Sequence, residues 1–285
     1  MLDRRSVFLA VPAMLALSSL AARADDAELA DLERRHGGRL GVAAFDTGSG
    51  KTIAHRADER FAMCSTFKLL MTAASLHRVD AGDEHPARSI SYGRADLLPH
   101  SPITGAHVAE GHMTVEALCE AVITTSDNGA ANLLLHALGG PDAVTLYAVT
   151  LGDSVTRLDR FEPALNDVGP GDVRDTTTPS AMLGDLRKIF LTSALSEASR
   201  ARLVKWTRAS VTGKSRLRAG LPPGWIVGDK TGTGFKAETN DIAIAWPPRK
   251  PPVLITAYYT GSSEPAAARE AVLADVGRIV ARRFS

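Results

Sequence analysis

The sequence contains few aromatic residues and no excess of charge of either sign. Only 5% of its 285 residues are Phe, Trp or Tyr, and 33 Lys and Arg stand against 32 Asp and Glu. A protein that binds nucleic acid or an anionic membrane through its overall field needs a clear excess of positive charge. The balance therefore predicts no nucleic-acid partner.

Cysteine is almost absent. Cys64 and Cys119 are the only two, so at most one disulfide could form, and the sequence alone does not pair them. Cys64 directly precedes a serine, and Cys119 lies in an apolar stretch with helical spacing. Two buried free thiols are favoured, because an unpaired cysteine behaves as a small apolar side chain. A disulfide, which export would permit, is the alternative.

The N-terminal apolar run is too short to cross a membrane. It covers Val7–Leu20, whereas a spanning helix needs roughly 20 residues. Arg4 and Arg5 precede it and Ala22-Arg23-Ala24 follows it, an order typical of a secretory signal peptide. Residues 1–24 are therefore predicted to be removed after Ala24, with a retained membrane anchor as the alternative.

Export would place the mature chain, residues 25–285, in the periplasm or outside the cell. The pair Arg4-Arg5 is compatible with the twin-arginine route and with the charged start of a Sec signal, and both routes remain open. No cysteine follows the apolar run closely enough to carry a lipid. No membrane anchor is therefore expected after cleavage.

Hydrophobic periodicity divides the mature chain into three parts. A helix over 25–36 and strands over 39–45 and 52–55 come first, helical spacing dominates up to about residue 206, and strands return near the end. The predicted later elements are helices Thr66–Val79, Thr114–Thr124, Gly129–Leu138, Pro141–Leu151 and Pro179–Leu191, strands Trp225–Gly228, Asp241–Trp246 and Val253–Tyr259, and helix Pro265–Arg283.

This order predicts an α+β fold. Strands from both ends of the chain most economically share one five-stranded antiparallel sheet flanked by the terminal helices. An α/β domain of residues 25–60 and 213–285 would then enclose an inserted all-helical domain, 61–212, with the active cleft where the two meet. The stretch at about 157–178 is long for a loop in a compact domain, which indicates a functional role.

Two motifs in the helical part carry reactive groups. Ser65 and Lys68 begin an apolar-faced helix, and their spacing places both on one face. A serine hydroxyl needs a base to become a nucleophile, and a lysine of lowered pKa could be that base. Ser126-Asp127-Asn128 lies between two helices, where a polar turn can aim side chains into a cleft, although a helix N-cap is the alternative.

A third motif, Lys230-Thr231-Gly232, precedes Thr233 and Gly234 near a strand. A cation, hydroxyls and glycines along a strand edge suit a ligand carboxylate; a strand end with a solvated lysine is the alternative. In this order the three motifs are typical of class A β-lactamases and penicillin-binding proteins. The sequence resembles the class A β-lactamases from about Asp25 to Ser285.

A fourth element distinguishes these two groups of proteins. The run from Arg160 through Glu162 to Asn166, with Asp175 after it, resembles the omega loop of the family. The resemblance implies that Glu162 and Asn166 hold a hydrolytic water, and that Arg160 and Asp175 close the neck of the loop as an ion pair. A penicillin-binding protein stays acylated because nothing activates water against its ester.

The resemblance also implies the remaining roles. Ser65 would attack the lactam carbonyl, with the backbone amides of Ser65 and Thr233 holding the oxyanion. Lys68, or Glu162 through a water, would take the serine proton, and Ser126 would protonate the ring nitrogen. Substrate contacts are implied for Asn128 and Asn166, and carboxylate contacts for Lys230, Thr231, Gly232 and Thr233. No metal and no organic cofactor are implied.

Three positions depart from common patterns of the family. Some relatives carry a disulfide at the positions of Cys64 and Gly234, which cannot form here. His100 stands where many relatives have an aromatic gate; an ordinary exposed loop histidine is the alternative. Arg216 resembles an arginine that supports the substrate carboxylate in some members, with a solvated arginine as the alternative.

The predicted function is thus hydrolysis of a small-molecule β-lactam, penicillins first and cephalosporins with them, conferring resistance. A penicillin-binding protein or covalent β-lactam sensor that acylates without turnover is the alternative, and a silent binding module is a third. Glu162 and the signal-like N-terminus disfavour a penicillin-binding protein or sensor. The intact residues Ser65, Lys68 and Ser126 disfavour a silent binding module. The resemblance implies a monomer.

Overall fold

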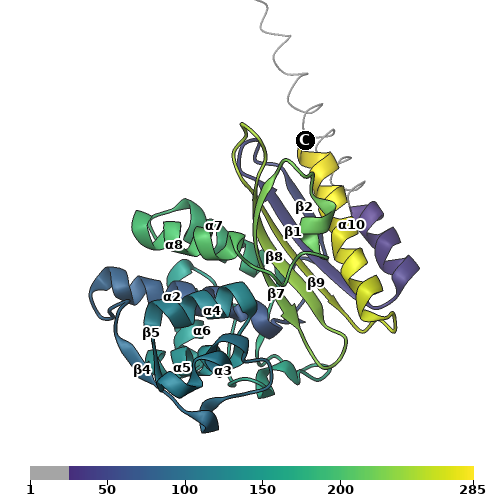
Figure 1. The fold of residues 1–285 in the computed structure, drawn as a ribbon. Coiled ribbons are helices and arrows are strands. Elements are labelled where there is room, and N and C mark those ends of the chain that lie inside the picture. Colours follow the sequence, from purple (N-terminus) through teal and green to yellow (C-terminus); the bar gives the residue numbers. More distant parts are fainter. Residues whose placement is uncertain (1–25) are drawn as a thin grey trace, which may run out of the picture.

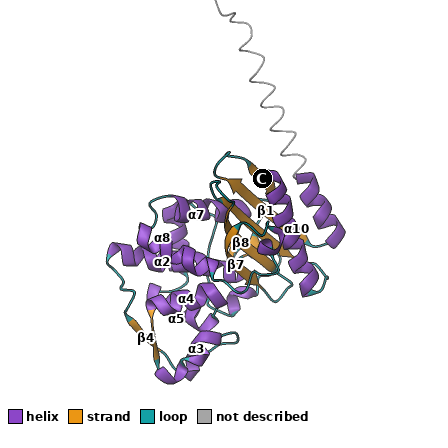
Figure 2. Ribbon diagram, turned by 45° about the horizontal axis from the view of Figure 1, so that its top comes forward, coloured by secondary structure: helices purple, strands orange, loops and turns teal. Residues whose placement is uncertain are grey.

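The computed structural model describes residues 26–285, so the predicted signal peptide lies outside the described residues. Within this range no helix is long and apolar enough to cross a membrane. The chain folds around one five-stranded antiparallel sheet with helices on both sides, which confirms the predicted α+β class (Figure 1, Figure 2).

The sheet joins the two ends of the chain. Its order is β2-β1-β9-β8-β7, so the first strand pairs with the last. The strands are β1 (Arg39–Asp46), β2 (Thr52–His55), β7 (Ile226–Thr233), β8 (Thr239–Trp246) and β9 (Val253–Thr260). Strand β7 continues five residues beyond its predicted end at Gly228, because Lys230 and Thr231 pair with Ile242 and Asp241 of β8. The Lys-Thr-Gly motif therefore lies within an edge strand.

Alternate side chains of the sheet enter two separate cores, as the period of a strand requires. In β8, Ile242 and Ile244 pack with the helical part, whereas Ala243 and Ala245 pack toward the terminal helices. Those helices, residues 26–36 and α10 (Ala266–Phe284), lie side by side on the same face (Figure 1). The opposite face is thus free to carry the helical part.

The middle of the chain contains the five predicted helices, here α2, α4, α5, α6 and α7, and three more. Helix α8 escaped prediction because only Leu203 and Trp206 are large, buried apolar side chains on it. The bounds are α2 (Phe67–Ala81), α3 (Pro102–Ala106), α4 (Val115–Thr125), α5 (Asn128–Leu138), α6 (Asp142–Leu151), α7 (Pro179–Leu191), α8 (Glu197–Arg208) and α9 (Leu217–Gly220).

This middle part is not entirely helical, contrary to the prediction. It holds two ribbons whose strands span only two or three residues, too short for alternation to reveal. Strand β4 (Ser89–Ser91) pairs with β5 (His112–Thr114), and β3 (Phe61–Ala62) pairs with β6 (Thr176–Thr177). The second ribbon fixes the end of the omega loop beside the segment that leads to Ser65.

Candidate functional site

The predicted residues meet in a cleft of about 410 Å³ between β7 and the helical part. The predicted residues that line it are Ser65, His100, Ser126, Asn128, Asn166, Arg216, Thr231 and Thr233. Lys68, Glu162 and Lys230 are buried beside it, with at most 3% of each exposed. The cleft thus brings together all the motifs that are far apart in the sequence.

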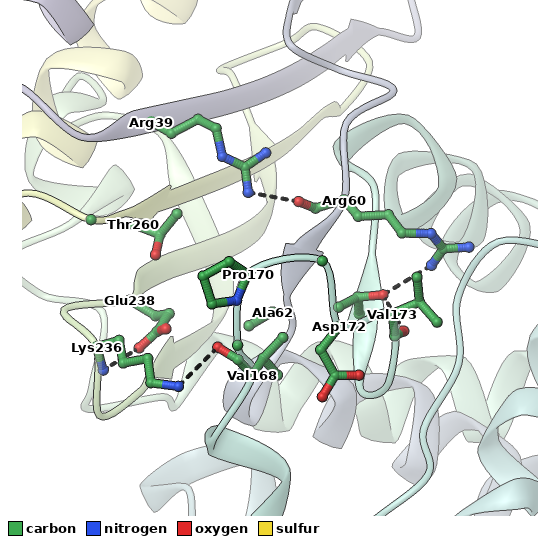
Figure 3. A pocket seen from close by; sticks show the side chains of 14 residues that line it. Arg39, Arg60, Ala62, Val168, Pro170, Asp172, Val173, Lys236, Glu238 and Thr260 are labelled. Atoms are coloured by element: carbon green, nitrogen blue, oxygen red, sulfur yellow. Dashed lines mark hydrogen bonds between the residues drawn. The ribbon is translucent and has the colours of Figure 1, made fainter.

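A larger cavity of about 540 Å³ lies on the other side of the omega loop (Figure 3). Arg39 and Arg60 line one part of it, and Lys236 and Glu238 another. Its walls contain none of the motif residues. Convergent hydroxyls, cations and a carboxylate, rather than volume, identify a reaction site, so the smaller cleft is the candidate.

The candidate nucleophile lies within reach of a carboxylate. Ser65 is in the short 3-10 helix Cys64–Thr66 that leads directly into α2. Its Oγ donates to Glu162 Oε1 at 3.4 Å, and Lys68 Nζ lies 3.0 Å from the same oxygen. One carboxylate oxygen therefore faces both the hydroxyl and the amine.

Lys68 is completely buried and surrounded by acceptors. Its Nζ donates to Ser126 O at 2.9 Å and to Asn128 Oδ1 at 2.5 Å, in addition to Glu162. Burial lowers the pKa of Lys68, and the charge and hydrogen bond of Glu162 oppose that shift. The balance makes the neutral amine more accessible than that of a solvated lysine.

Ser126 lies between the two lysines. Lys230 Nζ donates to its Oγ at 2.9 Å, and Lys68 Nζ approaches the same atom at 3.5 Å. Burial holds the pKa of Lys230 well below its usual range, and the neighbouring charge of Lys68 lowers it further. The backbone of Ser126 has a φ of 63°, a conformation uncommon outside glycine that aims this side chain between both ammonium groups.

The cap interpretation of the Ser-Asp-Asn motif holds for its middle residue. Asp127 is the N-cap of α5, where its side chain accepts from Ala130 N at 2.8 Å, and it also accepts from the amides of Ile103 and Thr104. Its neighbours Ser126 and Asn128 contact Lys68. The motif therefore combines a cap with two cleft side chains.

Glu162 is held both from within the omega loop and from helix α5. Asn166 Nδ2 donates to Glu162 Oε2 at 2.6 Å, while Asn132 of α5 donates to the carbonyl of Glu162 and accepts from its amide, both at 2.9 Å. Asn132 was missed at the sequence level. No local signal marks it, because Asn128 and His136 are polar residues of the same helix.

The neck of the loop is closed by an ion pair. Arg160 Nε lies 2.5 Å from Asp175 Oδ2, and Asp175 is fully buried. The other oxygen of Asp175 accepts from the amides of Asp159 and Arg160. This arrangement matches the pairing that the resemblance implies.

Arg216 is buried under the far end of the cleft. It donates to the carbonyls of Gly232 and Asn240 and to Thr233 Oγ1 at 2.8–2.9 Å, so it is not the solvated arginine of the alternative interpretation. Thr231 Oγ1 donates to Thr212 Oγ1 at 2.7 Å. Thr212 is a second site residue that the sequence did not predict. Its partner Thr231 lies 19 residues away, so no local pattern indicates the contact.

Gly232 has a steric role. A Cβ there would lie 2.7 Å from the carbonyl oxygen of Met63, closer than such atoms approach. Only glycine lets β7 approach the segment preceding Ser65 this closely.

Both cysteines are free and buried, as predicted. Burial raises the pKa of Cys119 to about 12 and that of Cys64 well above its usual range. His100 is exposed at the cleft, where its Nε2 lies 2.8 Å from Thr125 O and its own carbonyl accepts from Asn128 N. These contacts place it beside the cleft, and its role as a gate stays a prediction.

Known proteins are similar to this chain in both sequence and fold. The β-lactamase OXY-1 of Klebsiella oxytoca is 47% identical over 273 residues, which cover 95% of this chain and 94% of the relative. CTX-M-8 of Citrobacter amalonaticus is 46% identical over 269 residues, covering 94% and 92%. Among solved structures, an ancestral (GNCA) class A β-lactamase matches with a TM-score of 0.89 at 58% identity, covering 91% of this chain and all of the other.

The fold and these relatives define a β-lactam hydrolase of class A. The model of the β-lactamase enzyme family matches residues 26–284. The chain belongs to this family.

We expect Arg160→Ser to lower the free energy of unfolding by about 3 kcal/mol, because it leaves the buried carboxylate of Asp175 without its cation. Arg174→Ser is the matched control: its partner Asp172 and its own side chain are on the surface, and exposed pairs contribute little. Urea denaturation measures both. Equal effects of the two substitutions would contradict a special role for the buried pair.

Proposed function

We propose that this protein hydrolyses penicillins, and cephalosporins with them, through an acyl-enzyme on Ser65. The observation that carries the proposal is the position of Glu162, whose Oε1 faces Ser65 Oγ and Lys68 Nζ while Oε2 faces Asn166. A carboxylate so close to the nucleophile can act on the ester that this nucleophile forms.

Acylation would begin with loss of the Ser65 proton. Lys68 in its neutral form, or Glu162 through a water, is the candidate base: Glu162 Oε1 contacts both Ser65 Oγ and Lys68 Nζ. The backbone amides of Ser65 and Thr233 would hold the oxyanion. Ser126, which accepts a hydrogen bond from Lys230, would deliver the proton to the departing ring nitrogen.

Substrate would be held at both ends of the cleft. Lys230, Thr231 and Thr233 would bind its carboxylate, with Arg216 fixing Thr233 from below. Gly232 would keep the strand backbone close. At the other end Asn128, whose amide nitrogen donates to Pro99 O at 2.8 Å, would bind the side-chain amide of the drug.

Deacylation would use Glu162 as a general base toward water. Asn166 Oδ1 is buried and accepts no hydrogen bond from the described part of the protein. That oxygen and the carboxylate of Glu162 are two acceptors on one side of Ser65, a pair suited to orient a water. Turnover of this kind would confer β-lactam resistance.

The remaining features of the proposal concern the cell and the assembly. We infer export through the Sec or twin-arginine route to the periplasm or the medium, and action as a monomer without metal or cofactor. The alternative, a penicillin-binding protein or sensor that acylates and stalls, has no use for the contacts of Asn166 and Asn132 that hold Glu162 in place.

We expect Glu162→Gln to accumulate a covalent adduct on Ser65, with deacylation slowed by about 10²- to 10⁴-fold, the usual contribution of a general base. Intact-mass measurement during reaction with benzylpenicillin would detect the adduct. Ser65→Ala is the control and should show no added mass. Rapid turnover by Glu162→Gln would remove this residue from the deacylation step.

We expect the acylation rate to fall at acidic pH, with the midpoint set by the pKa of Lys68. A protonated Lys68 cannot accept the serine proton, so the rate falls as the pH falls through its lowered pKa. Glu162→Gln removes the charge that supports the ammonium form, and the midpoint should therefore move to lower pH. Stopped-flow acylation of both proteins over pH measures the shift; complete loss of acylation in the variant would assign the base to Glu162 instead.

A further inference from the structure

Two buried carboxyl groups meet at the base of the omega loop. Asp153 follows α6 at the start of the loop region, and Asp185 lies on α7, just beyond its end. Both line one cavity of about 410 Å³ that shares no lining residue with the cleft. Asp153 is 8% exposed and Asp185 only 1%.

Neither group is fully satisfied. Oδ2 of Asp153 and Oδ2 of Asp185 are buried and have no hydrogen-bond partner in the described part of the protein, and neither residue has a cation within 4 Å there. Lys188 lines the same cavity but is exposed and forms no ion pair with them. Two ionised carboxylates buried at one cavity without a cation are strongly unfavourable, so one of them must hold a proton.

The surroundings decide which one. Asp153 Oδ1 already accepts from the amides of Val155 and Thr156 at 2.6 and 3.1 Å. Asp185 accepts no hydrogen bond from a backbone amide. Burial, and then the charge and hydrogen bond of Asp153, raise the pKa of Asp185 well above its usual range.

The other ionisable groups around Asp185 do not replace that proton. Burial raises the pKa of the phenols of Tyr147 on α6 and Tyr258 on β9, and the charge of Asp185 adds to both shifts, so they stay neutral. Asp58, which also lines the cavity, is exposed and adds negative charge. Among the described residues that line this cavity, Lys188 on the same helix is the one cation.

The pair lies where the two ends of the loop are joined. Thr156 Oγ1 lies 2.6 Å from Thr177 Oγ1, and the amide of Arg157 donates to Thr176 O at 3.0 Å. Arg60 Nη1 donates both to Val155 O and to Thr176 Oγ1. Asp153 holds the entry segment of this junction through the amides of Val155 and Thr156, and Asp185 lies on α7, which follows the exit strand β6.

We propose that Asp185 is a positioning residue for hydrolysis: as a neutral acid it keeps its proton, donates a hydrogen bond to Asp153 and so closes the base of the loop that carries Glu162. The effect on activity rests on the proposed deacylating role of Glu162. Loss of the proton would set two carboxylates against each other and loosen the junction.

The test compares deacylation rates of the full mature enzyme, Asp185→Asn and Asp185→Leu across pH in single-turnover experiments with benzylpenicillin. Asparagine donates from its amide at every pH, and leucine never donates. We expect the Asn-to-wild-type ratio to be near one at acidic pH and to rise about tenfold as Asp185 ionises. The ratio cancels titrations of other groups, such as Lys230. For leucine we expect a ratio below one at acidic pH.

A ratio for Asp185→Asn that stays constant over the whole range, in enzymes that deacylate through Glu162, would overturn the inference. Lys188→Met is the matched control from the same cavity and should keep the wild-type profile. If its profile changes in the manner expected for Asp185→Asn, Lys188 rather than a proton bridges the pair.

A direct measurement separates this inference from the proposed function. The ¹³Cγ resonance of Asp185 in the wild-type enzyme should report a protonated carboxyl group at neutral pH, and an ionised Asp185 there would refute the inference whatever the deacylation mechanism. A protonated Asp185 with a flat activity ratio, in an enzyme whose Glu162→Gln variant still turns over, would instead point to failure of the role assigned to Glu162.

Discussion

Two ammonium groups are buried under one small cleft, and the arrangement of the site depends on how their charge is balanced. Lys68 and Lys230 are each fully buried, and the charge of Lys68 adds to burial in lowering the pKa of Lys230. Ser126 lies between them as a shared acceptor. Lys68 has one carboxylate within ion-pairing distance among the described residues, Glu162, so the charge of the helical part is balanced from the omega loop.

The position of the omega loop relative to the helices therefore has to be fixed. Asn132 forms hydrogen bonds with the backbone of Glu162, and Asn166 with its side chain. The buried ion pair of Arg160 with Asp175 closes the neck of the loop. Each contact fixes the carboxylate that stabilises the lysine in the resting enzyme. In the proposed reaction the same carboxylate then activates water, so electrostatic balance and deacylation share one structural requirement.

The sequence could predict the long elements and the residues of the motifs, because hydrophobic periodicity and spacing are local properties. It could not predict where β7 ends, since Gly228, Asp229 and Lys230 disfavour strands and only pairing with β8 keeps them extended. The contacts of Asn132 and the meeting of Asp153 with Asp185 depend on tertiary packing between distant segments. Nothing in the local sequence distinguishes those residues from ordinary polar positions.

The central claim is that the carboxylate of Glu162 beside Ser65 allows deacylation and therefore repeated turnover. Steady-state hydrolysis of benzylpenicillin by the mature chain, residues 25–285, tests it most directly through loss of lactam absorbance. The account predicts many turnovers per enzyme molecule with no lasting adduct. A single stoichiometric burst followed by a stable acylated protein would contradict it, because Ser65 would then react while Glu162 failed to activate water.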